Sequence, residues 1–506
     1  MTDNTNYNYE DVNSSHPEWN NNIARYKFFN NSYEGGIAYS NAGYLPHFVY
    51  ENGEDYAKRI ASTPLDNHCR NIIQIYTSFL FSKAPIRDFD GIDIDASLDD
   101  FLEDADLEKR DFNAFMRDAS VLASIHGSAL ILVDRPATAV ETKADELTGG
   151  IRPYVSLVSA ENVIDWRYER QDNGKYELVM LKILEDSTVG NRVFRYYYQS
   201  HIDIVKVNDD IEKTEISDRF ENPLGYIPAV WLYNERSPVR GVGISDLTDL
   251  ADLQKSIYSD YDELDSTLKL SNHPSLVMTR TGVDANAGPG AIIYVDETIP
   301  EQLKPYLLQP SSASVDSIIY SIKTKVESID RIAHLGGIRT TTTTPMSGVA
   351  LQIERSLLQA RLQGKANNLN IAEENIWDIW ADWQNLEWHG QVVYPTGYSI
   401  RDTSTELNSL KVAKDILPLN EQLNKEIDRK VAELVITDPD RLDNIVRLMD
   451  DAEADVMSDN KEHPTLVADN WKLHIQTMID DGYTLSEIEA IHPELTQLML
   501  ADNVQT

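Results

Sequence analysis

The sequence predicts an α+β fold that is mainly helical. Apolar residues recur at helical spacing in long runs between residues 244 and 388. From residue 153 to about 233 they alternate instead with a period near two, as in antiparallel strands. With 42% hydrophobic residues among 506, the chain can bury a large core, either as several domains or as one multi-region subunit.

The composition is strongly acidic, with 83 acidic residues against 45 basic ones and a formal net charge of −38. A monomer with this charge repels DNA and anionic lipid. Two interpretations stay open. One is general solubility, including adaptation to salt. The other is a surface that must not adhere to a polyanion passing close by.

Cysteine usage and hydropathy exclude several classes of protein. Cys69 is the single cysteine, so no intrachain disulfide and no cysteine-based metal site can form. It precedes the apolar run 72–75, which favours the buried face of a helix over a nucleophile. No window approaches the roughly 18 apolar residues of a membrane span, and the polar beginning does not resemble a signal peptide. We expect a soluble protein made in a reducing cytoplasm.

The first 134 residues contain three kinds of predicted structure: an arm, helices and a strand. Residues 1–24 are rich in Asn, Ser and Tyr without any period, which predicts a flexible arm, disordered or ordered only against a partner. Apolar periodicity then predicts four helices, and the apolar run 128–134 predicts a buried strand. The helices are expected at 54–62, 66–82, 98–105 and 110–125.

Polar turns divide the alternating block into four strand-like runs, at 154–158, 177–183, 193–198 and 202–207. The cluster Tyr196-Tyr197-Tyr198 fits either a stacking platform for nucleic acid or the filling of a strand. Strand filling is favoured because basic residues do not interleave densely with the rings.

A first long helix is predicted at 244–272, about 40 Å long, and His273-Pro274 ends it. Acidic residues occupy its other faces, and its apolar residues form one stripe. The stripe is Ile244, Leu247, Leu250, Leu253, Ile257, Tyr261, Leu264 and Leu268. After it, 275–279 and 291–295 are predicted strands joined by a Gly-rich loop.

A second striped helix is predicted at 311–335, from a serine-rich N-cap to Gly336-Gly337. Its apolar stripe is Val315, Ile318, Ile319, Ile322, Val326, Ile329 and Ile332. Three basic residues also lie on this helix: Lys323, Lys325 and Arg331.

The loop that follows carries five consecutive threonines. It runs through Arg339, Thr340, Thr341, Thr342, Thr343 and Thr344. Threonine hydroxyls are costly to bury, so the loop is either a flexible linker or a mobile polar loop facing a water-filled space. The spacing of a phosphate-binding P-loop is absent.

The remaining chain is predicted to be helical. A third helix from about 348 to 388 spans roughly 60 Å, and its Trp-rich stretch 376–383 is typical of a core contact. The tail 404–506 is acidic, with apolar stripes at 423–434 and 442–449.

The order helix, small β insert, helix, polar loop and very long helix resembles the portal proteins of tailed bacteriophages, the head-to-tail connectors. The resemblance covers about residues 50–390, and the order of elements carries more of it than any one motif. Local segments also resemble those proteins, namely 79–85, 126–136, 151–155, 159–166 and 347–353.

The resemblance implies a portal-type domain organisation. Its parts are a flexible arm at 1–24, a wing at 25–243, stem helices at 244–272 and 311–335, a clip at 273–310, a tunnel loop at 336–347, a long helix with the return to the wing at 348–403, and a helical crown at 404–506.

It also implies a function. Portal proteins form a dodecameric ring at one capsid vertex of the virion, assembled in the host cytoplasm. They act as the channel for DNA packaging and ejection. Their partners are double-stranded DNA, the major capsid protein, the terminase large subunit and then tail adaptor proteins at the clip. They are not enzymes, use no cofactor or metal and do not enter a membrane.

Physical reasoning gives each feature a place in such a ring. The stripes would pack against neighbouring copies, and an acidic wall would let DNA slide. Lys323, Lys325, Arg331 and Arg339 would make weak contacts with DNA. An inter-subunit salt bridge from these residues to the acidic first helix is an equal alternative.

Two other classes of protein are alternatives to a portal protein. A carboxylate-based, metal-dependent hydrolase lacks a His/Asp constellation at ligand spacing, and residues 225–243 hold no phosphate-binding pattern. The histidines are scattered singly at His68, His126, His201, His273 and His334. The second class is another structural ring or scaffold protein of a virion.

Overall fold

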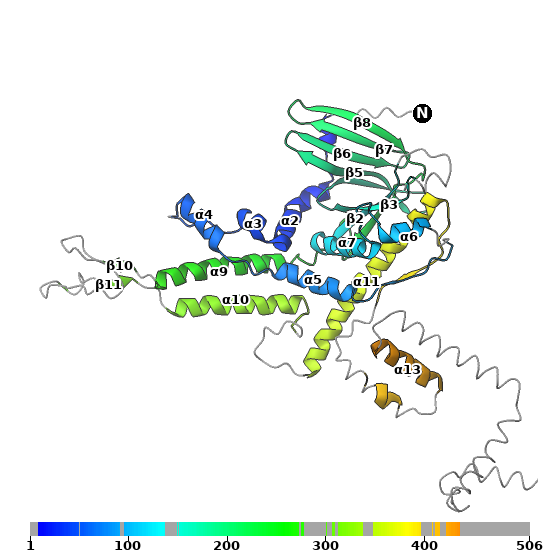
Figure 1. Ribbon diagram of the computed structural model, residues 1–506. Coiled ribbons are helices and arrows are strands. Elements are labelled where there is room, and N and C mark those ends of the chain that lie inside the picture. Colours follow the sequence, from blue (N-terminus) through cyan, green and yellow to red (C-terminus); the bar gives the residue numbers. More distant parts are fainter. Residues whose placement is uncertain are drawn as a thin grey trace, which may run out of the picture. The chain divides into compact units, whose positions relative to one another are not determined.

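The computed structural model describes residues 9–49, 51–91, 96–136, 149, 151–272, 275–277, 300, 306–308, 312–336, 348–395, 407, 410–414 and 421–435. The chain divides into two compact units, Met1–Tyr398 and Ser399–Thr506. Both α and β structure is present, and helices predominate among the described residues (Figure 1).

Helices, two larger sheets and two short strand pairs build the described part of the first unit. The helices are α1 (Tyr9–Asn13), α2 (Pro17–Glu34), α3 (Gly36–Asn41), α4 (Gly53–Ser62), α5 (His68–Leu80), α6 (Ala96–Glu103), α7 (Phe112–His126), α9 (Leu250–Asn272), α10 (Ser312–Ile332) and α11 (Gly348–Gln384). Two pairs of short strands join them: β1 (Ile86–Arg87) with β12 (Val392–Val393), and β10 (Ser275–Val277) with β11 (Tyr306–Leu308).

Local signals explain where these helices begin and end. The side chain of Asn67 accepts the Arg70 N–H at 2.8 Å and caps α5. Asp111 caps α7 in the same way, through the Ala114 N–H at 2.9 Å. Gly127 ends α7 in the left-handed region, with φ of 91°. Its carbonyl lies so close to Gly243 that neither position has room for a side chain.

A three-stranded antiparallel sheet forms the centre of the first unit, with β2 (Ser128–Asp134) between β3 (Tyr154–Ser159) and β9 (Ala229–Tyr233). Every residue of β2 is buried, as its unbroken apolar sequence predicts. Helices α7 and α11 pack against this sheet.

The alternating block forms a second, five-stranded sheet in which neighbours in sequence pair in an antiparallel way. Its strands are β4 (Val163–Arg170), β5 (Tyr176–Thr188), β6 (Asn191–Tyr198), β7 (His201–Asn208) and β8 (Lys213–Glu221). Tyr196 and Tyr197 are buried, which confirms strand filling for these two rings. Tyr198 is half-buried and stacks on His201.

The prediction of a flexible arm at 1–24 is wrong for residues 9–24. Val12 is fully buried in an apolar cluster on the five-stranded sheet, and Trp19 Nε1 donates to the Glu161 carbonyl at 2.9 Å. The buried Lys182 ammonium donates to the carbonyls of Val12 and Ser14. The Asn-rich composition hid the helix that starts at Pro17. Residues 1–8 lie outside the described part of the chain.

The three long helices exist, with shifted ends. The first begins at Leu250 rather than at residue 244, because residues 244–249 bond to other elements instead of continuing the helix. The Ile244 N–H donates to the Glu235 carbonyl at 2.8 Å, and the Asp246 N–H to the Ser124 carbonyl at 3.1 Å. The third helix ends at Gln384 rather than near 388.

The predicted insert and tail are described only in part. Of the strand expected at 275–279, residues 275–277 pair with β11, which was not predicted, while 291–295 lie outside the described residues. In the second unit, α13 (Glu421–Val435) confirms a helix at the first predicted stripe, with Ile427 and Ala432 buried. The second stripe at 442–449 falls outside the described residues.

Candidate functional site

Helices α9 and α10 lie side by side and form the candidate site, called here the helix pair (Figure 1). Asp260 of α9 accepts hydrogen bonds from Ser321 Oγ at 2.9 Å and from Lys325 Nζ at 2.6 Å, both on α10. On the two sides of these contacts, the helix pair differs in how far its side chains are buried. Its inner half, around 250–259 and 326–332, is held by the rest of the chain, and its outer half, 260–272 and 312–325, is more exposed.

The inner half is buried through both apolar and polar contacts. Leu247, Leu250 and Ile257 of the predicted stripe are buried within the subunit itself. Gln254 is also fully buried. Its Nε2 donates to the carbonyl of Ser32 at 2.9 Å, and its Oε1 accepts the Cys69 N–H at 2.8 Å. One side chain thus joins α9 to α2 and α5.

Cys69 is a structural residue in this contact. Burial raises the pKa of its thiol to about 12, so the thiol stays protonated at neutral pH. The interpretation of Cys69 as a residue on the buried face of a helix is confirmed.

A cluster of buried charges, called here the base, fixes the start of α9 to α11. The Asp246 carboxylate accepts from Lys365 Nζ at 2.6 Å, from Arg361 at 3.0 Å and from Asn234 Nδ2 at 3.0 Å. Burial alone would raise the pKa of Asp246, but the two cations outweigh it and hold the pKa below its usual value. The cations stay paired, as buried charges must.

The same cluster reaches the end of α10 through Tyr76. The Tyr76 hydroxyl donates to the Ala333 carbonyl at 2.6 Å, just past α10. The Arg361 guanidinium and the Lys365 ammonium lie 5.3 and 5.6 Å from the centre of the Tyr76 ring. Both helices of the pair are therefore fixed at one set of side chains.

A second ionic contact holds the pair farther along α9. Arg59 of α4 is bonded to Asp262, and it also donates to Glu51 at 2.7 Å. Its guanidinium stacks 4.0 Å from the centre of the Phe48 ring. Hydrogen bonding to Arg59 lowers the pKa of Glu51 to about 2. Thr63 Oγ1 donates to the other oxygen of Asp262 at 3.2 Å.

The outer half leaves apolar side chains in solvent. Tyr320 is 73% exposed, Ile319 49% and Leu268 38%. Val315, Ile318 and Ile322 are half-buried. Within the described residues, nothing covers these side chains fully. The stripes are thus divided: the chain itself fills their inner ends, which corrects the expectation that whole stripes serve as contacts between copies.

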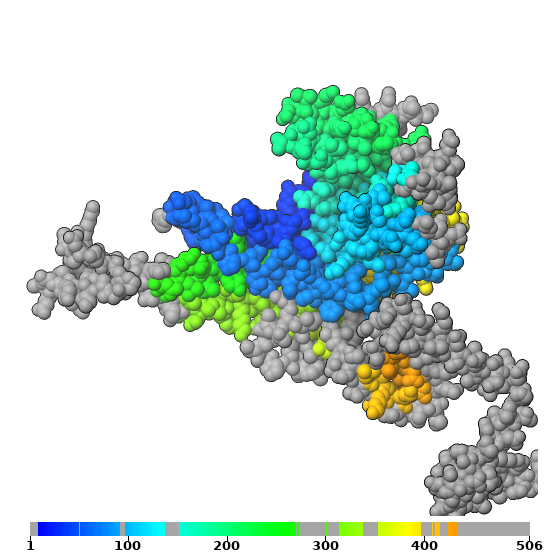
Figure 2. All heavy atoms as spheres, viewed as in Figure 1, coloured from blue at the N-terminus to red at the C-terminus, as the bar shows by residue number. Residues whose placement is uncertain are grey.

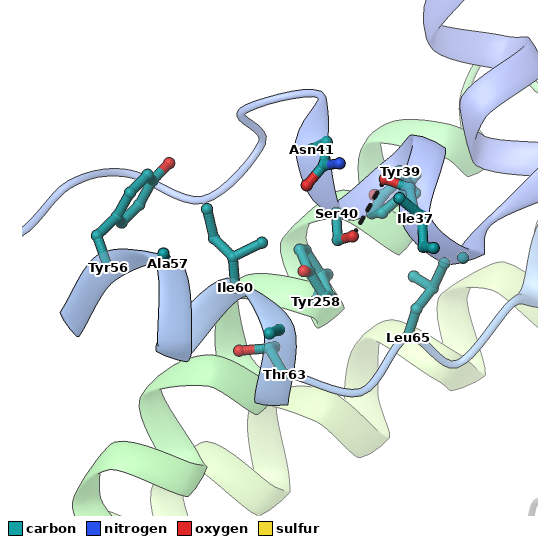
Figure 3. A pocket seen from close by; sticks show the side chains of 12 residues that line it. Ile37, Tyr39, Ser40, Asn41, Tyr56, Ala57, Ile60, Thr63, Leu65 and Tyr258 are labelled. Carbon is teal, nitrogen blue, oxygen red and sulfur yellow. Dashed lines mark hydrogen bonds between the residues drawn. The ribbon is translucent and has the colours of Figure 1, made fainter. Parts of the chain in front are cut away.

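An apolar groove of about 630 Å³ lies beside the pair, between α3, α4 and α9 (Figure 3). In Figure 2 the surface of α4 lies against that of α9. The groove residues are Gly36, Ile37, Tyr39, Ser40, Asn41, Tyr56, Ala57, Ile60, Ala61, Thr63, Leu65 and Tyr258. These twelve include no carboxylate, imidazole, thiol or amine, so the groove offers shape and apolar contact but no strong acid or base.

The residues predicted to contact DNA do not form one cluster in the described structure. Lys325 is paired with Asp260 inside one chain rather than across a subunit boundary, and Lys323 and Arg331 are exposed on α10. Arg339 and Thr340–Thr344 lie outside the described residues. Of the acidic residues placed on the outer faces of the first helix, Asp246 and Asp262 are instead buried in ion pairs.

Sequence reasoning missed the base and the Arg59 contact. Asp246 and Lys365 are 119 positions apart, and Arg59 and Asp262 are 203 apart, so no local spacing connects them. A usable signal was present at Lys365 alone, a charged residue in the apolar register of the long helix, between Leu362 and Leu369.

The described residues offer neither a metal site nor a membrane-spanning helix. They contain no group of three or more His, Cys, Asp or Glu residues placed to hold a metal ion. No helix among them combines the length and the apolar character that crossing a bilayer requires.

Comparisons with known proteins give a weak structural likeness. No protein family and no curated protein matches the sequence. One similar solved structure is described as the virion of a native gene transfer agent (GTA) particle, with 8% identity, a TM-score of 0.40 and coverage of 77% of this chain and 97% of the other. Another is the neck of an empty GTA particle, with 7% identity, a TM-score of 0.38 and coverage of 78% and 99%. A likeness of this degree carries no argument about fold or function.

Proposed function

We propose that this chain is a portal-type subunit of a virion, one of about twelve copies that form a ring around a channel for DNA at a capsid vertex. The observation that carries the proposal is the divided helix pair. Its inner half is fixed by buried charges, while its outer half presents Tyr320, Ile319 and Leu268 to solvent. A neighbouring copy would cover these side chains, as the packing of a ring requires.

The acidic composition supports the same role. A formal charge of −38 per copy gives the assembled wall a strong negative potential. DNA carries a dense line of negative charge, so such a wall repels it and prevents adhesion. A passage for DNA needs this property, whereas a site that stores DNA needs the opposite.

The proposal includes the partners and location of portal proteins. Terminase would dock during packaging, tail adaptor proteins would bind afterwards, and the major capsid protein would surround the ring. The role is structural and not enzymatic, without cofactor. A carboxylate-based hydrolase remains the less favoured reading.

The first experiment measures the assembly directly. Native mass measurement and negative-stain imaging of the full chain are expected to show a ring of about twelve 57.3 kDa subunits with a central hole. A stable monomer or dimer contradicts the proposal. A closed ring that never associates with packaged DNA would favour the alternative, another structural ring or scaffold protein of a virion.

A pair of variants tests whether the outer half makes the contact between copies. The double variant Ile319→Ser with Tyr320→Ser is expected to abolish the ring and leave a folded subunit. Its control, Val189→Ser with Ile211→Ser, also removes two exposed apolar side chains, in turns of the five-stranded sheet. The control should assemble normally. Equal assembly of both variants contradicts the role of the helix pair.

The threonine loop gives a separate test of the channel. Deleting Arg339–Thr344 is expected to leave the ring intact and to impair the packaging or retention of DNA. Normal packaging by rings of this deletion variant would remove the loop from the proposal without affecting the assembly.

A further inference from the structure

Three arginines near one edge of the five-stranded sheet have no acidic partner. Arg170, Arg236 and Arg240 are exposed and make no ion pair with any residue in the described ranges. The chain holds 83 acidic residues against 45 basic ones, so carboxylates are abundant. The local fold of the chain keeps these carboxylates away from the three arginines.

The pleat of the β4–β5 hairpin separates the charges. Arg170 lies directly opposite Tyr176, and Glu169 lies opposite Glu177. Because side chains alternate between the faces of a sheet, the two glutamates point to one face and Arg170 with Tyr176 to the other. Arg170 shares its face with Trp166, whose ring belongs to the core beneath. The carboxylates nearest in sequence are therefore on the wrong side to pair.

The other two arginines come from the loop after β9 and stack on tyrosine rings. The Arg240 guanidinium lies 3.7 Å from the centre of the Tyr176 ring, and Arg236 lies 5.1 Å from that of Tyr233. Tyr176 is 46% exposed, so this stack is at the surface. Burial raises the pKa of Tyr168, and the charges of Arg240 and Arg236 both oppose that rise, so both act on the same tyrosine.

The loop that carries these groups is held in one conformation. Trp166 Nε1 donates to the Arg240 carbonyl at 2.9 Å, and the Gly241 N–H donates to the Tyr233 hydroxyl at 2.9 Å. Ser128 Oγ donates to the Gly241 carbonyl at 3.1 Å. Gly241 has φ of 83°, and a side chain there would collide with the ring of Trp166. The backbone that carries Arg240 is thus fixed by these three hydrogen bonds.

Nearby acidic residues do not pair with these arginines. Glu235 is next to Arg236 in sequence but forms no ion pair with it in the described part of the chain, and its charge also acts on Arg361 and Lys365 of the base. In the turn 171–175, Asp172 and Lys175 carry opposite charges, so the turn adds no net charge. The face keeps three positive charges within a chain of −38.

A stacked guanidinium keeps its N–H edge free for a planar, two-pronged contact with phosphate. Three such groups separated by rings match a chain of spaced phosphates better than a single carboxylate. We propose that the face formed by Arg170, Arg236, Arg240, Tyr176 and Tyr233 binds the phosphodiester backbone of DNA by charge, without reading its sequence. This site lies on the sheet rather than in a channel, and the inference holds whether or not the chain is a portal.

Fluorescence polarisation with a short labelled DNA duplex tests the site on the full chain. The triple variant Arg170→Gln, Arg236→Gln, Arg240→Gln is expected to weaken binding at least tenfold at low salt. The control triple Lys83→Gln, Arg117→Gln, Lys206→Gln removes the same charge from exposed positions elsewhere and should bind like the parent. Three phosphate contacts predict an affinity loss on the order of 40-fold between about 50 and 200 mM NaCl, and the site triple should lose this dependence.

Two outcomes overturn the inference. Equal weakening by both triples would mean that only net charge matters. Binding of an acidic peptide such as poly-glutamate, with no binding of duplex DNA, would assign the face to a protein partner. Unchanged thermal unfolding of both triples shows that the fold is intact. Ring assembly is measured in parallel, so a failure of this site and a failure of the proposed function are distinguished.

Discussion

The two halves of the helix pair differ in how far the rest of the chain covers them. The inner half is fixed by charges, with Asp246 and Lys365 buried, Arg361 half-buried beside them, and Gln254 bonded to two further helices. The outer half includes a buried ion pair, Asp262 with Arg59, but it leaves apolar side chains exposed, Tyr320 and Ile319 among them. The comparison teaches that the base fixes the helix pair to the rest of its own chain, whereas the outer half is the part able to contact other chains.

Removal of Asp246 should give the largest effect on folding. Asp246→Ala leaves the buried Lys365 charge and the half-buried Arg361 charge without their counter-charge, so we expect a loss of about 3–5 kcal/mol in the free energy of unfolding. Urea denaturation measures it. The outer-half variant Tyr320→Ser is the contrast, with a change within about 0.5 kcal/mol. Similar losses from the two variants would contradict the division of the pair.

Low pH should also destabilise the part of the chain that holds the inner half, through His126 at the end of α7, whose ring contacts Tyr26 and Ser159. Burial lowers the pKa of His126 to about 4, and its Nε2 has no partner among the described residues. The unfolded chain takes up this proton near pH 6.5, so stability is complete above that pH and is lost as pH falls from 6.5 towards 4.

The expected loss is at most about 3 kcal/mol and is seen in urea midpoints measured across that pH window. His126→Gln carries no proton at either pH and should show a flatter dependence. If the variant and the parent follow the same curve, His126 is not the group that responds.

The Gln254 contact should rank next. Gln254→Ala removes a fully buried amide and leaves its two partners, the Ser32 carbonyl and the Cys69 N–H, unsatisfied, at a cost of about 2 kcal/mol. Thermal unfolding checks the change. Gln199→Ala, which removes a half-buried amide in the turn between β6 and β7, is a suitable control and should cost well under half as much.

The smallest effect is expected at the junction of the two halves. Lys325→Met removes the partner of Asp260, but both side chains are partly in solvent, so the loss should stay below about 1 kcal/mol. It should also shrink as salt screens the pair. A loss that is large and independent of salt would place Lys325 with the buried charges of the base.

Sequence patterns predicted the periodic parts of this fold and missed its long-range polar contacts. The striped helices, the buried strand 128–134 and the alternating sheet follow from apolar spacing, which local sequence records. The base does not follow from apolar spacing, because an aspartate such as Asp246 looks the same in sequence whether it faces water or a lysine 119 residues away. Burial of Val12 against Lys182 was missed for the same reason.

Of the candidate site, the sequence located the helix pair but not the division of its stripes. Ile257 and Ile319 are equal members of apolar stripes, yet the first is buried and the second is 49% exposed. Helices α2 and α5 pack against α9, which carries Ile257, and Ile319 is on α10. The spacing of apolar residues does not record which other helices pack against a stripe. The arginine face was missed because its residues come from separate segments with no shared motif.

Contacts hold α9 at two places, at the base and at Asp262, which bonds to Arg59 of α4. The ten residues after Asp262 extend about 15 Å, so a tilt of about 5° at Asp262 displaces the end of the helix by about 1 Å. A force applied at that end acts on the Asp262–Arg59 contact and on α4 before it reaches the base and α11.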